Sequence, residues 1–427
     1  MMLKRLISTL VRDMEISPTL EIHQLTRDLE KEGKTIHKLG FGQSPFPVPE
    51  IVIDSLRQHA SQRTYLPVKG LDELRETIAN KYSKALGRPV RASQIIIGPG
   101  SKELIYIFQL AFGGMVILPT PSWVTYRPQS QLTGRKNIWI HTQFNDDYMV
   151  DPEMLRSFCV KNKGQAKSII LNYPNNPVGS MCPADRLNAI AEIARKYHLV
   201  VVSDEIYSEL TYPEEKMVSI ATYYPEGTII TSGISKWCGA GGWRLGILIL
   251  PDGLEPIGKA MVSIASETFS SVSAPVQFAA VTAYKGDAEI DLYLEQARHI
   301  LRKVGIYTYR ELIQSGLEMP KPQGAFYLFP SWYKYQKQLQ RIGIHTSKEL
   351  CAALVNDAGV ALLPGGAFRR PWEELTTRLA YVDFDGGTAM KAYPGCESLS
   401  DHDFVLQLAP KIHFAIQKIK MWLKELN

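Results

Sequence analysis

The stretch TIITSGISKWCGAGGWRLGILILP, residues 228–251, decides the fold. Two apolar runs, at 229–230 and 245–250, enclose a segment of small residues that carries Lys236. A lysine just after a buried strand, among small neighbours, is approachable and partly desolvated. Desolvation lowers the pKa of its amine and makes it a nucleophile suited to Schiff-base chemistry. An ordinary solvated lysine at a strand end is the alternative interpretation.

Similar apolar runs recur upstream, at 95–97, 115–118, 169–171 and 200–202, with helical patterns between them. Apolar strands that alternate with helices are typical of a parallel sheet covered on both faces. The segment 183–198 illustrates the helices, because its apolar residues recur at three- and four-residue spacing. The predicted fold class is therefore α/β, with a large, mainly parallel seven-stranded-type sheet covered by helices.

The ends of the chain differ from this central block. Residues 1–54 hold one helical stretch and the Pro-rich GQSPFPVP, which predicts an extended crossing segment. From about residue 306, long helical patterns alternate with the short strand candidates AFYLF and TRLAYV. At roughly 150 residues per domain, 427 residues predict more than one domain. We expect a large domain over 55–305 and a smaller α+β domain formed by 1–54 and 306–427.

Composition and charge exclude several classes of protein. A hydrophobic share of 45% and a charged share of 21% are ordinary for globular proteins and argue against disorder. The net charge of +5 comes without a basic block, which argues against nucleic acid. No apolar run approaches the roughly 20 residues that span a bilayer, and the first residues lack a secretory pattern. Five scattered cysteines predict neither a metal site nor disulfides, so we expect a cytoplasmic protein.

Three further motifs stand where predicted strands end, the edge at which open α/β sheets bind ligands. In IIIGPGSKELIYIF, Gly100, Ser101 and Lys102 open a helix whose free N–H groups suit a phosphate. In SIILNYPNNPVGSM, Asn176 stands in a rigid turn where its amide can face inward. Taken singly, either motif is also typical of a plain turn.

The third motif is LVVVSDEIYSEL, which contains Asp204 and Tyr207. A carboxylate at the end of a buried strand is costly unless a cation meets it. The candidate partners are an internal lysine or arginine, a metal, and a protonated ligand nitrogen. Metal is disfavoured because no cluster of histidines or acids accompanies Asp204.

Together these motifs resemble the class I/II aminotransferases, aspartate aminotransferase-like enzymes of the fold-type I pyridoxal phosphate group. GISKWCGAGGWRLG is similar to the family's cofactor attachment signature, with NPVG and SDEIY upstream in the family's order. The resemblance covers nearly the whole chain. It implies pyridoxal 5'-phosphate as cofactor, an amino acid and a 2-oxo acid such as 2-oxoglutarate as substrates, and a homodimer.

The resemblance also implies a role for each matched residue. Lys236 would bind the cofactor and move a proton, Asp204 would keep the cofactor's ring nitrogen protonated, and Tyr207 with Asn176 would hydrogen-bond its phenolic oxygen. The phosphate would be bound by Gly100, Ser101, Lys102 and Arg244, and by Tyr65 of the neighbouring subunit.

Trp123, in PTPSWVTY, would stack on the cofactor ring and face the substrate together with Asn176. Gly42 and Arg378, in GFGQSPF and TTRLAY, would bind the substrate carboxylate, Arg378 in bidentate fashion.

The match departs from the family pattern in three places. Gly233 stands where many relatives have a phosphate-binding serine, so Ser232 or Ser235 would have to replace it. FRRPWEELTTR replaces a glycine-rich approach to Arg378, and residues 382–403 look like an additional loop.

Two questions of function stay open in the sequence. Lys102 stands where one branch of aspartate and prephenate aminotransferases contacts the substrate's distal carboxylate, but it also suits the phosphate or solvent. Arg63, Arg127 and Arg369 are other candidates for that carboxylate, and Tyr126, Phe46 and Phe368 suggest an aromatic substrate instead. A C–S β-lyase or an aminocyclopropane carboxylate synthase-like lyase is the alternative activity. A non-catalytic regulator is disfavoured, because only about 40 residues precede the first family motif.

Overall fold

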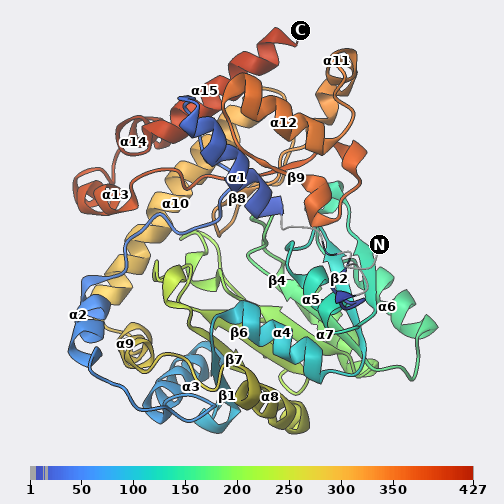
Figure 1. Cartoon of the computed structure of the whole chain (residues 1–427), viewed down its shortest axis with the longest axis vertical. Helices are drawn as coiled ribbons and strands as arrows, with labels where there is room; N and C mark the ends of the chain where they lie inside the picture. Colours follow the sequence, from blue (N-terminus) through green and yellow to red (C-terminus); the bar gives the residue numbers. More distant parts are fainter. Residues whose placement is uncertain (1–5, 13, 15–17, 427) are drawn as a thin grey trace.

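A seven-stranded, mostly parallel sheet forms the centre of the larger part of the molecule (Figure 1). The computed structural model describes residues 6–12, 14 and 18–426. The hydrogen-bonded strand order is β1-β7-β6-β5-β4-β2-β3. The strands are β1 (Ile95–Gly98), β2 (Met115–Thr120), β3 (Asn137–His141), β4 (Lys167–Asn172), β5 (Val200–Asp204), β6 (Thr228–Gly233) and β7 (Gly246–Ile249). The fold class expected from the sequence is confirmed.

One strand of this sheet runs against the others. β7 pairs antiparallel with both β6 and β1, whereas β2 to β6 pair in parallel. The link from β6 to β7 contains the Lys236 segment and only a short 3-10 turn, with no crossover helix. A parallel pairing would need such a crossover, so the chain folds back on itself. This link between β6 and β7 places Lys236 at the edge of the sheet where the parallel strands end.

Helices cover both faces of the sheet, which explains the uninterrupted apolar strands. On β5, Val200 and Val202 pack in one apolar cluster with residues of α4 (Ser101–Ala111) and α8 (Glu255–Thr268). Val201 packs on the opposite face with residues of α6 (Pro152–Lys161) and α7 (Ala184–Lys196). Since successive strand residues point to opposite faces, both sets are buried. The remaining helices of this part are α2 (Glu50–His59), α3 (Asp72–Leu86), α5 (Tyr126–Leu132) and α9 (Ala274–Tyr284).

A second, antiparallel sheet has the order β8-β10-β9, with β8 (Tyr327–Leu328), β9 (Leu363–Pro364) and β10 (Thr377–Ala380). Around it lie α1 (Pro18–Lys31), α12 (Ser347–Ala358) and α15 (Pro410–Glu425), in the upper half of Figure 1. The N-terminal segment joins this sheet, because His37 bridges to Val360 and the Ala380 N–H donates to Leu39. The long helix α10 (Ala288–Gln314) runs along one side of the molecule, from the larger part to the upper part, and contains the expected boundary near residue 305 (Figure 1). A shorter helix, α11 (Gln336–Arg341), lies at the edge of this part.

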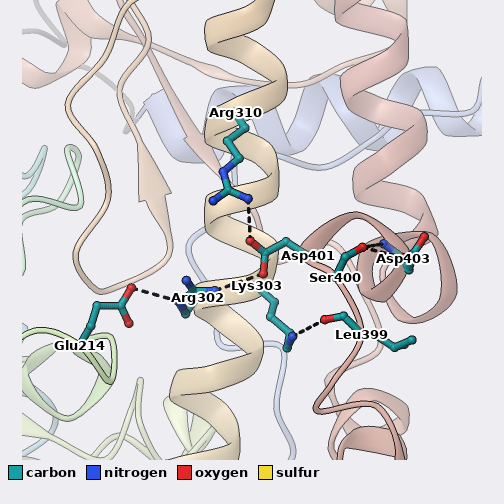
Figure 2. Close-up of polar contacts among 8 residues, drawn as sticks. All are labelled: Glu214, Arg302, Lys303, Arg310, Leu399, Ser400, Asp401 and Asp403. Atoms are coloured by element: carbon teal, nitrogen blue, oxygen red, sulfur yellow. Dashed lines mark hydrogen bonds and ion pairs between the residues drawn. The ribbon is translucent and has the colours of Figure 1, made fainter.

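The stretch 382–403, expected as a loop, is largely helical. It contains α13 (Gly386–Ala392) and a 3-10 turn, and it leads into α14 (Asp401–Leu408). Asp401 pairs with Arg302 and Arg310 of α10, each at 3.1 Å, and Arg302 also pairs with Glu214 at 3.1 Å (Figure 2). The segment is therefore held against α10 by charge.

Among the described residues, no helix is both long enough and apolar enough to cross a bilayer.

Candidate active site

The strand ends of the large sheet and the edge of the small sheet enclose a cleft of about 780 Å³. Asn172 ends β4 and Asp204 ends β5, and the two residues are paired in register. Ten residues predicted from the sequence line this cleft: Gly42, Ser101, Lys102, Trp123, Asn176, Asp204, Tyr207, Lys236, Arg244 and Arg378. Motifs that span more than 330 residues of sequence thus meet in one place.

Lys236 lies at the centre of the cleft, on the turn after β6. Its amine donates to the Gly42 carbonyl at 2.5 Å and lies 5.8 Å from the ring centres of Tyr207 and Phe326. Burial, and then the positive charges of Arg378, Lys102 and Arg244, lower the pKa of Lys236 to about 8. About a tenth of the amine is therefore neutral and nucleophilic at pH 7, far more than for a lysine with the ordinary pKa of about 10.4.

Asp204 is 2% exposed and faces the cleft from the end of β5. Its carboxylate accepts hydrogen bonds from the Tyr126 hydroxyl at 2.6 Å and the Ile206 N–H at 3.3 Å, and it forms no ion pair with any described residue. Burial raises the pKa of Asp204 to about 6, against the stabilising effect of these two donors and of Lys236. The positive charge of Lys236, which is not in an ion pair with Asp204, therefore offsets only part of the cost of burying the carboxylate.

Tyr207 and Asn176 also line the cleft. The Tyr207 hydroxyl is 2.8 Å from that of Tyr327. The Asn176 side-chain oxygen accepts from Arg378 at 3.1 Å, which directs the amide NH₂ of Asn176 away from the arginine. Both residues thus carry groups that can donate hydrogen bonds at the wall of the cleft.

Arg378 is buried and held between two aromatic rings. Its guanidinium carbon lies 4.7 Å from the ring centre of Tyr327 and 5.1 Å from that of Phe368. It donates to Asn176 and to the Gly40 carbonyl, while its Nε is buried without a partner. Burial lowers the pKa of Arg378, which nevertheless remains a cation. A cation so placed is suited to a carboxylate that enters the cleft.

The start of α4 forms the third wall. Gly100 precedes the helix with φ +95°, and Ser101 and Lys102 occupy its first turn, where backbone N–H groups have no intrahelical acceptor. A Cβ on Gly100 would lie 2.3 Å from Arg244 Nη2, so only glycine lets this arginine approach the turn. Arg244 donates to the carbonyls of Pro99 and Gly241. These groups form a positive cup suited to a phosphate.

The missing serine at position 233 has a structural reason. A Cβ at Gly233 would lie 2.7 Å from the Leu245 carbonyl oxygen, across the β6–β7 pair. Ser232 donates to the Glu205 carbonyl, whereas Ser235 lines the cleft. Of the two candidate replacements, Ser235 is the one placed near the cup.

Several expected residues lie outside this cleft. Tyr65 is 89% exposed and does not line it. Arg63, Arg127, Arg369, Phe46 and Phe368 do not line it either. Lys102 does, with its amine 5.3 Å from the ring centre of Trp123. Loss of hydration and the nearby charge of Arg244 lower the pKa of Lys102.

The wall residues that sequence reasoning missed include Tyr327 and Leu20 of α1. It named Tyr126 but not its role as the partner of Asp204. Tyr126 follows Trp123 by one helical turn, which was a usable signal. The strand that contains Tyr327 has the sequence of an ordinary core strand, and Leu20 reaches the cleft from a helix far away in sequence. Neither residue therefore carried a signal in the sequence that would have assigned it to the site.

The donor set fits pyridoxal phosphate. An unpaired buried carboxylate, a nucleophilic amine and a positive helix start are present in one cleft. They match the protonatable ring nitrogen, the aldehyde and the phosphate of that molecule.

Fold and site together define a fold-type I enzyme. Residues 34–382 match the family model described as "Aminotransferase class I and II", and the chain belongs to this family. It is an aminotransferase, and members of the family use pyridoxal phosphate.

Individual relatives agree with this assignment. The chain is 34% identical to the aspartate aminotransferase of Geobacillus stearothermophilus over 84% of its length and 91% of that protein. The structure of Thermus thermophilus aspartate aminotransferase with maleate superposes with a TM-score of 0.83 at 26% identity, over 97% of this chain and 99% of that chain. An aromatic aminotransferase from Pyrococcus horikoshii superposes with a TM-score of 0.78 at 26% identity, over 94% and 99% of the two chains.

Proposed function

We propose that the chain binds pyridoxal 5'-phosphate and transfers the amino group of an acidic L-amino acid, aspartate above all, to a 2-oxo acid such as 2-oxoglutarate. The observation that carries the proposal is the convergence of Lys236, Asp204 and Arg378 on one cleft. The Lys236 amine would react with the cofactor, and the Asp204 carboxylate would stabilise the protonated ring nitrogen. Arg378 would bind the carboxylate of the substrate.

The cofactor would be held at three points. Lys236 would bind its aldehyde, and Asp204 its ring nitrogen. The backbone N–H groups at Gly100, Ser101 and Lys102, together with the side chains of Arg244 and Ser235, would bind its phosphate, and the Lys102 amine would not take part. When bound, pyridoxal phosphate supplies a ring that takes up the electron pair released when the substrate Cα loses its proton.

The chain's own residues do the remaining work. Lys236, with a pKa near 8, can accept and return a proton at the substrate Cα near neutral pH. Tyr207 and Asn176 would donate hydrogen bonds to the phenolic oxygen, and Trp123 would stack on the ring. Arg378 and the backbone of Gly42 would orient the substrate carboxylate, so that the Cα proton faces the amine.

The charge of the cleft favours a dicarboxylate. Among the described residues that line it, Lys102, Lys236, Arg244 and Arg378 are basic, and Asp204 alone is acidic. Once the carboxylate and phosphate sites are assigned, the Lys102 amine beside Trp123 remains for a distal carboxylate. The relatives named aspartate aminotransferases support this choice.

The aromatic alternative receives less support from the geometry. The Tyr126 hydroxyl is engaged by Asp204, Phe46 packs edge-on against Tyr293 and Phe384, and Phe368 packs on Arg378. Phe46 and Phe368 therefore belong to the protein interior, whereas Tyr126 lines the cleft with its hydroxyl bound to Asp204.

Steady-state kinetics of Lys102→Met test the substrate class. We expect the KM for aspartate to rise about tenfold or more while the KM for phenylalanine changes little, because only aspartate loses a charge partner. Arg127→Met, which alters a residue outside the cleft, is the control. Equal changes for both amino acids would refute the dicarboxylate assignment.

We further propose a homodimer in which Tyr65 reaches the phosphate site of the partner. Its 89% exposure outside its own cleft supports this role. Mixing Lys236→Ala with Tyr65→Ala subunits tests it, since each mixed dimer would contain one intact site. Random exchange should restore about a quarter of wild-type activity, whereas independent sites would restore none.

Two coarser proposals accompany these. The domain limits 1–54, 55–305 and 306–427 are supported by the separate sheets and by the contacts of the N-terminal segment with the small one. A cytoplasmic location is supported by the five cysteines, which are buried and unpaired within the described residues.

A further inference from the structure

Tyr327, on β8 of the small sheet, reaches across to the large sheet's side of the cleft. It pairs in register with Ala380 of β10, so Arg378, two residues away, is its diagonal neighbour on the same face. The side chain is 1% exposed and lines the cleft. Its placement between the two sheets therefore belongs to the site and not to the general core.

Two contacts join Tyr327 to residues with assigned roles. Its hydroxyl is 2.8 Å from the hydroxyl of Tyr207, and its ring lies 4.7 Å from the guanidinium carbon of Arg378. One side chain thus touches both the candidate donor to the cofactor and the candidate receptor of the substrate carboxylate.

The backbone at Gly42 makes room for this arrangement. A Cβ on Gly42 would lie 2.0 Å from the Tyr327 hydroxyl oxygen, so any larger residue would displace that hydroxyl. The Gly42 carbonyl also accepts from the Lys236 amine. The absence of a side chain here serves the tyrosine pair as well as the lysine.

The direction of the hydrogen bond between the two hydroxyls matters. Each tyrosine has a single hydroxyl proton, so Tyr207 can donate to a ligand only if it accepts from Tyr327. Burial raises the pKa of both hydroxyls. For Tyr327 the largest influence that opposes this rise is Arg378, whose guanidinium carbon lies 4.7 Å from the Tyr327 ring centre. The more acidic hydroxyl is the better donor, which favours donation from Tyr327 to Tyr207.

Building on the proposed function, we propose that Tyr327 is a positioning residue whose hydroxyl donates a hydrogen bond to the Tyr207 hydroxyl. The Tyr207 hydroxyl is then free to donate its own hydrogen bond to the cofactor's phenolic oxygen. Because Tyr327 shares a sheet with Arg378, it also links the substrate-binding side of the cleft to the cofactor-binding side. Its hydroxyl acts only through Tyr207, whereas its ring acts on Arg378.

The pH titration of the visible absorbance of the pyridoxal phosphate-loaded protein tests this role. Tyr327→Phe removes the donated hydrogen bond and weakens Tyr207 as a donor to a negative oxygen. The pH at the midpoint of the absorbance titration should therefore rise by about half a unit. The ring under Arg378 remains, so the KM for the amino acid should stay within about twofold while kcat falls.

A double-mutant cycle separates this role from a structural one. In a Tyr207→Phe background, Tyr327→Phe should produce no further shift, because its hydroxyl has lost its target. Tyr381→Phe is a matched control, since Tyr381 forms a comparable buried pair with Tyr212 at 2.5 Å. The control should lower thermal stability without moving the midpoint.

If Tyr327→Phe does not fold, Gly42→Ala serves instead, because it keeps both hydroxyls and forces them apart. It should move the midpoint in the same direction. A wild-type protein that takes up no pyridoxal phosphate would overturn the proposed function and this inference with it. A loaded protein whose midpoint is unchanged in Tyr327→Phe, or shifts additively with Tyr207→Phe, would overturn the inference alone.

Discussion

Arg378 donates through Nη1 to the side-chain oxygen of Asn176 at 3.1 Å, joining the small sheet to the turn after β4 of the large one. The bond determines which end of the Asn176 amide faces the cleft, and it anchors one arm of the guanidinium. Cofactor-side and substrate-side residues are thus oriented by the same contact.

Arg378→Lys should raise the KM for the amino acid about 30- to 100-fold and lower kcat by less than tenfold. A lysine ammonium cannot reproduce the planar fork that pairs with a carboxylate while bonding Asn176 and Gly40. Arg91→Lys, in an exposed ion pair with Asp252, is the control and should leave KM unchanged. An unaltered KM in Arg378→Lys would remove this residue from substrate binding.

The rate at which the cofactor-free protein takes up pyridoxal phosphate should depend on pH through Lys236. Its pKa is lowered to about 8, so the neutral amine increases about tenfold per unit below pH 8 and levels off above it. Stopped-flow absorbance between pH 6 and 10 would measure the profile. A rate that still rises about tenfold per pH unit up to pH 10, as for an ordinary lysine with a pKa of about 10.4, would contradict the desolvated site.

Asp204→Asn should stabilise the cofactor-free protein while abolishing most turnover. The folded pKa of about 6 lies above the unfolded value. The ionised carboxylate therefore opposes folding fully above pH 6, and the penalty fades as pH falls to 4. The gain in unfolding free energy should reach about 3 kcal/mol at pH 7 to 8.

Urea unfolding of the cofactor-free protein at pH 4 and pH 7.5 would measure this gain. Asp185→Asn, at an exposed position on α7, should show no comparable gain. A loss of stability in Asp204→Asn at pH 7.5 would mean that the carboxylate is satisfied without the cofactor.

Asp401→Asn should destabilise the protein by about 1 kcal/mol and less at high salt, because it releases Arg302 and Arg310 from α14 (Figure 2). Asp403→Asn is the matched control, since Asp403 lies in the same first helical turn and bonds Ser400 instead of an arginine. Thermal unfolding at low and high salt would compare them. Equal losses for both variants would indicate a helix-start effect alone.

The sequence predicted what local pattern and motif order encode. Apolar runs buried on both faces marked the strands, and polar residues after Leu171 and Ser203 marked their functional ends. Lys236, Asp204, Asn176 and Arg378 do meet in one cleft.

What the sequence could not show depends on contacts between distant segments. The hydroxyl contact of Tyr207 with Tyr327 joins residues 120 positions apart, and Asp401 contacts arginines 91 and 99 positions away. Leu20 reaches the cleft from the N-terminal helix α1. The antiparallel β7 was hidden for a different reason, since its direction follows from the short link that carries Lys236 and not from its own residues.

Mixing the pyridoxal phosphate-loaded protein with L-aspartate, in the absence of any oxo acid, tests the central claim most directly. We predict that the visible absorbance disappears as an equivalent amount of pyridoxamine phosphate forms, and that 2-oxoglutarate restores it. Lys236→Ala should show neither change. Unchanged absorbance in the wild type, or pyruvate and ammonia released from a β-substituted amino acid without pyridoxamine phosphate, would contradict the account.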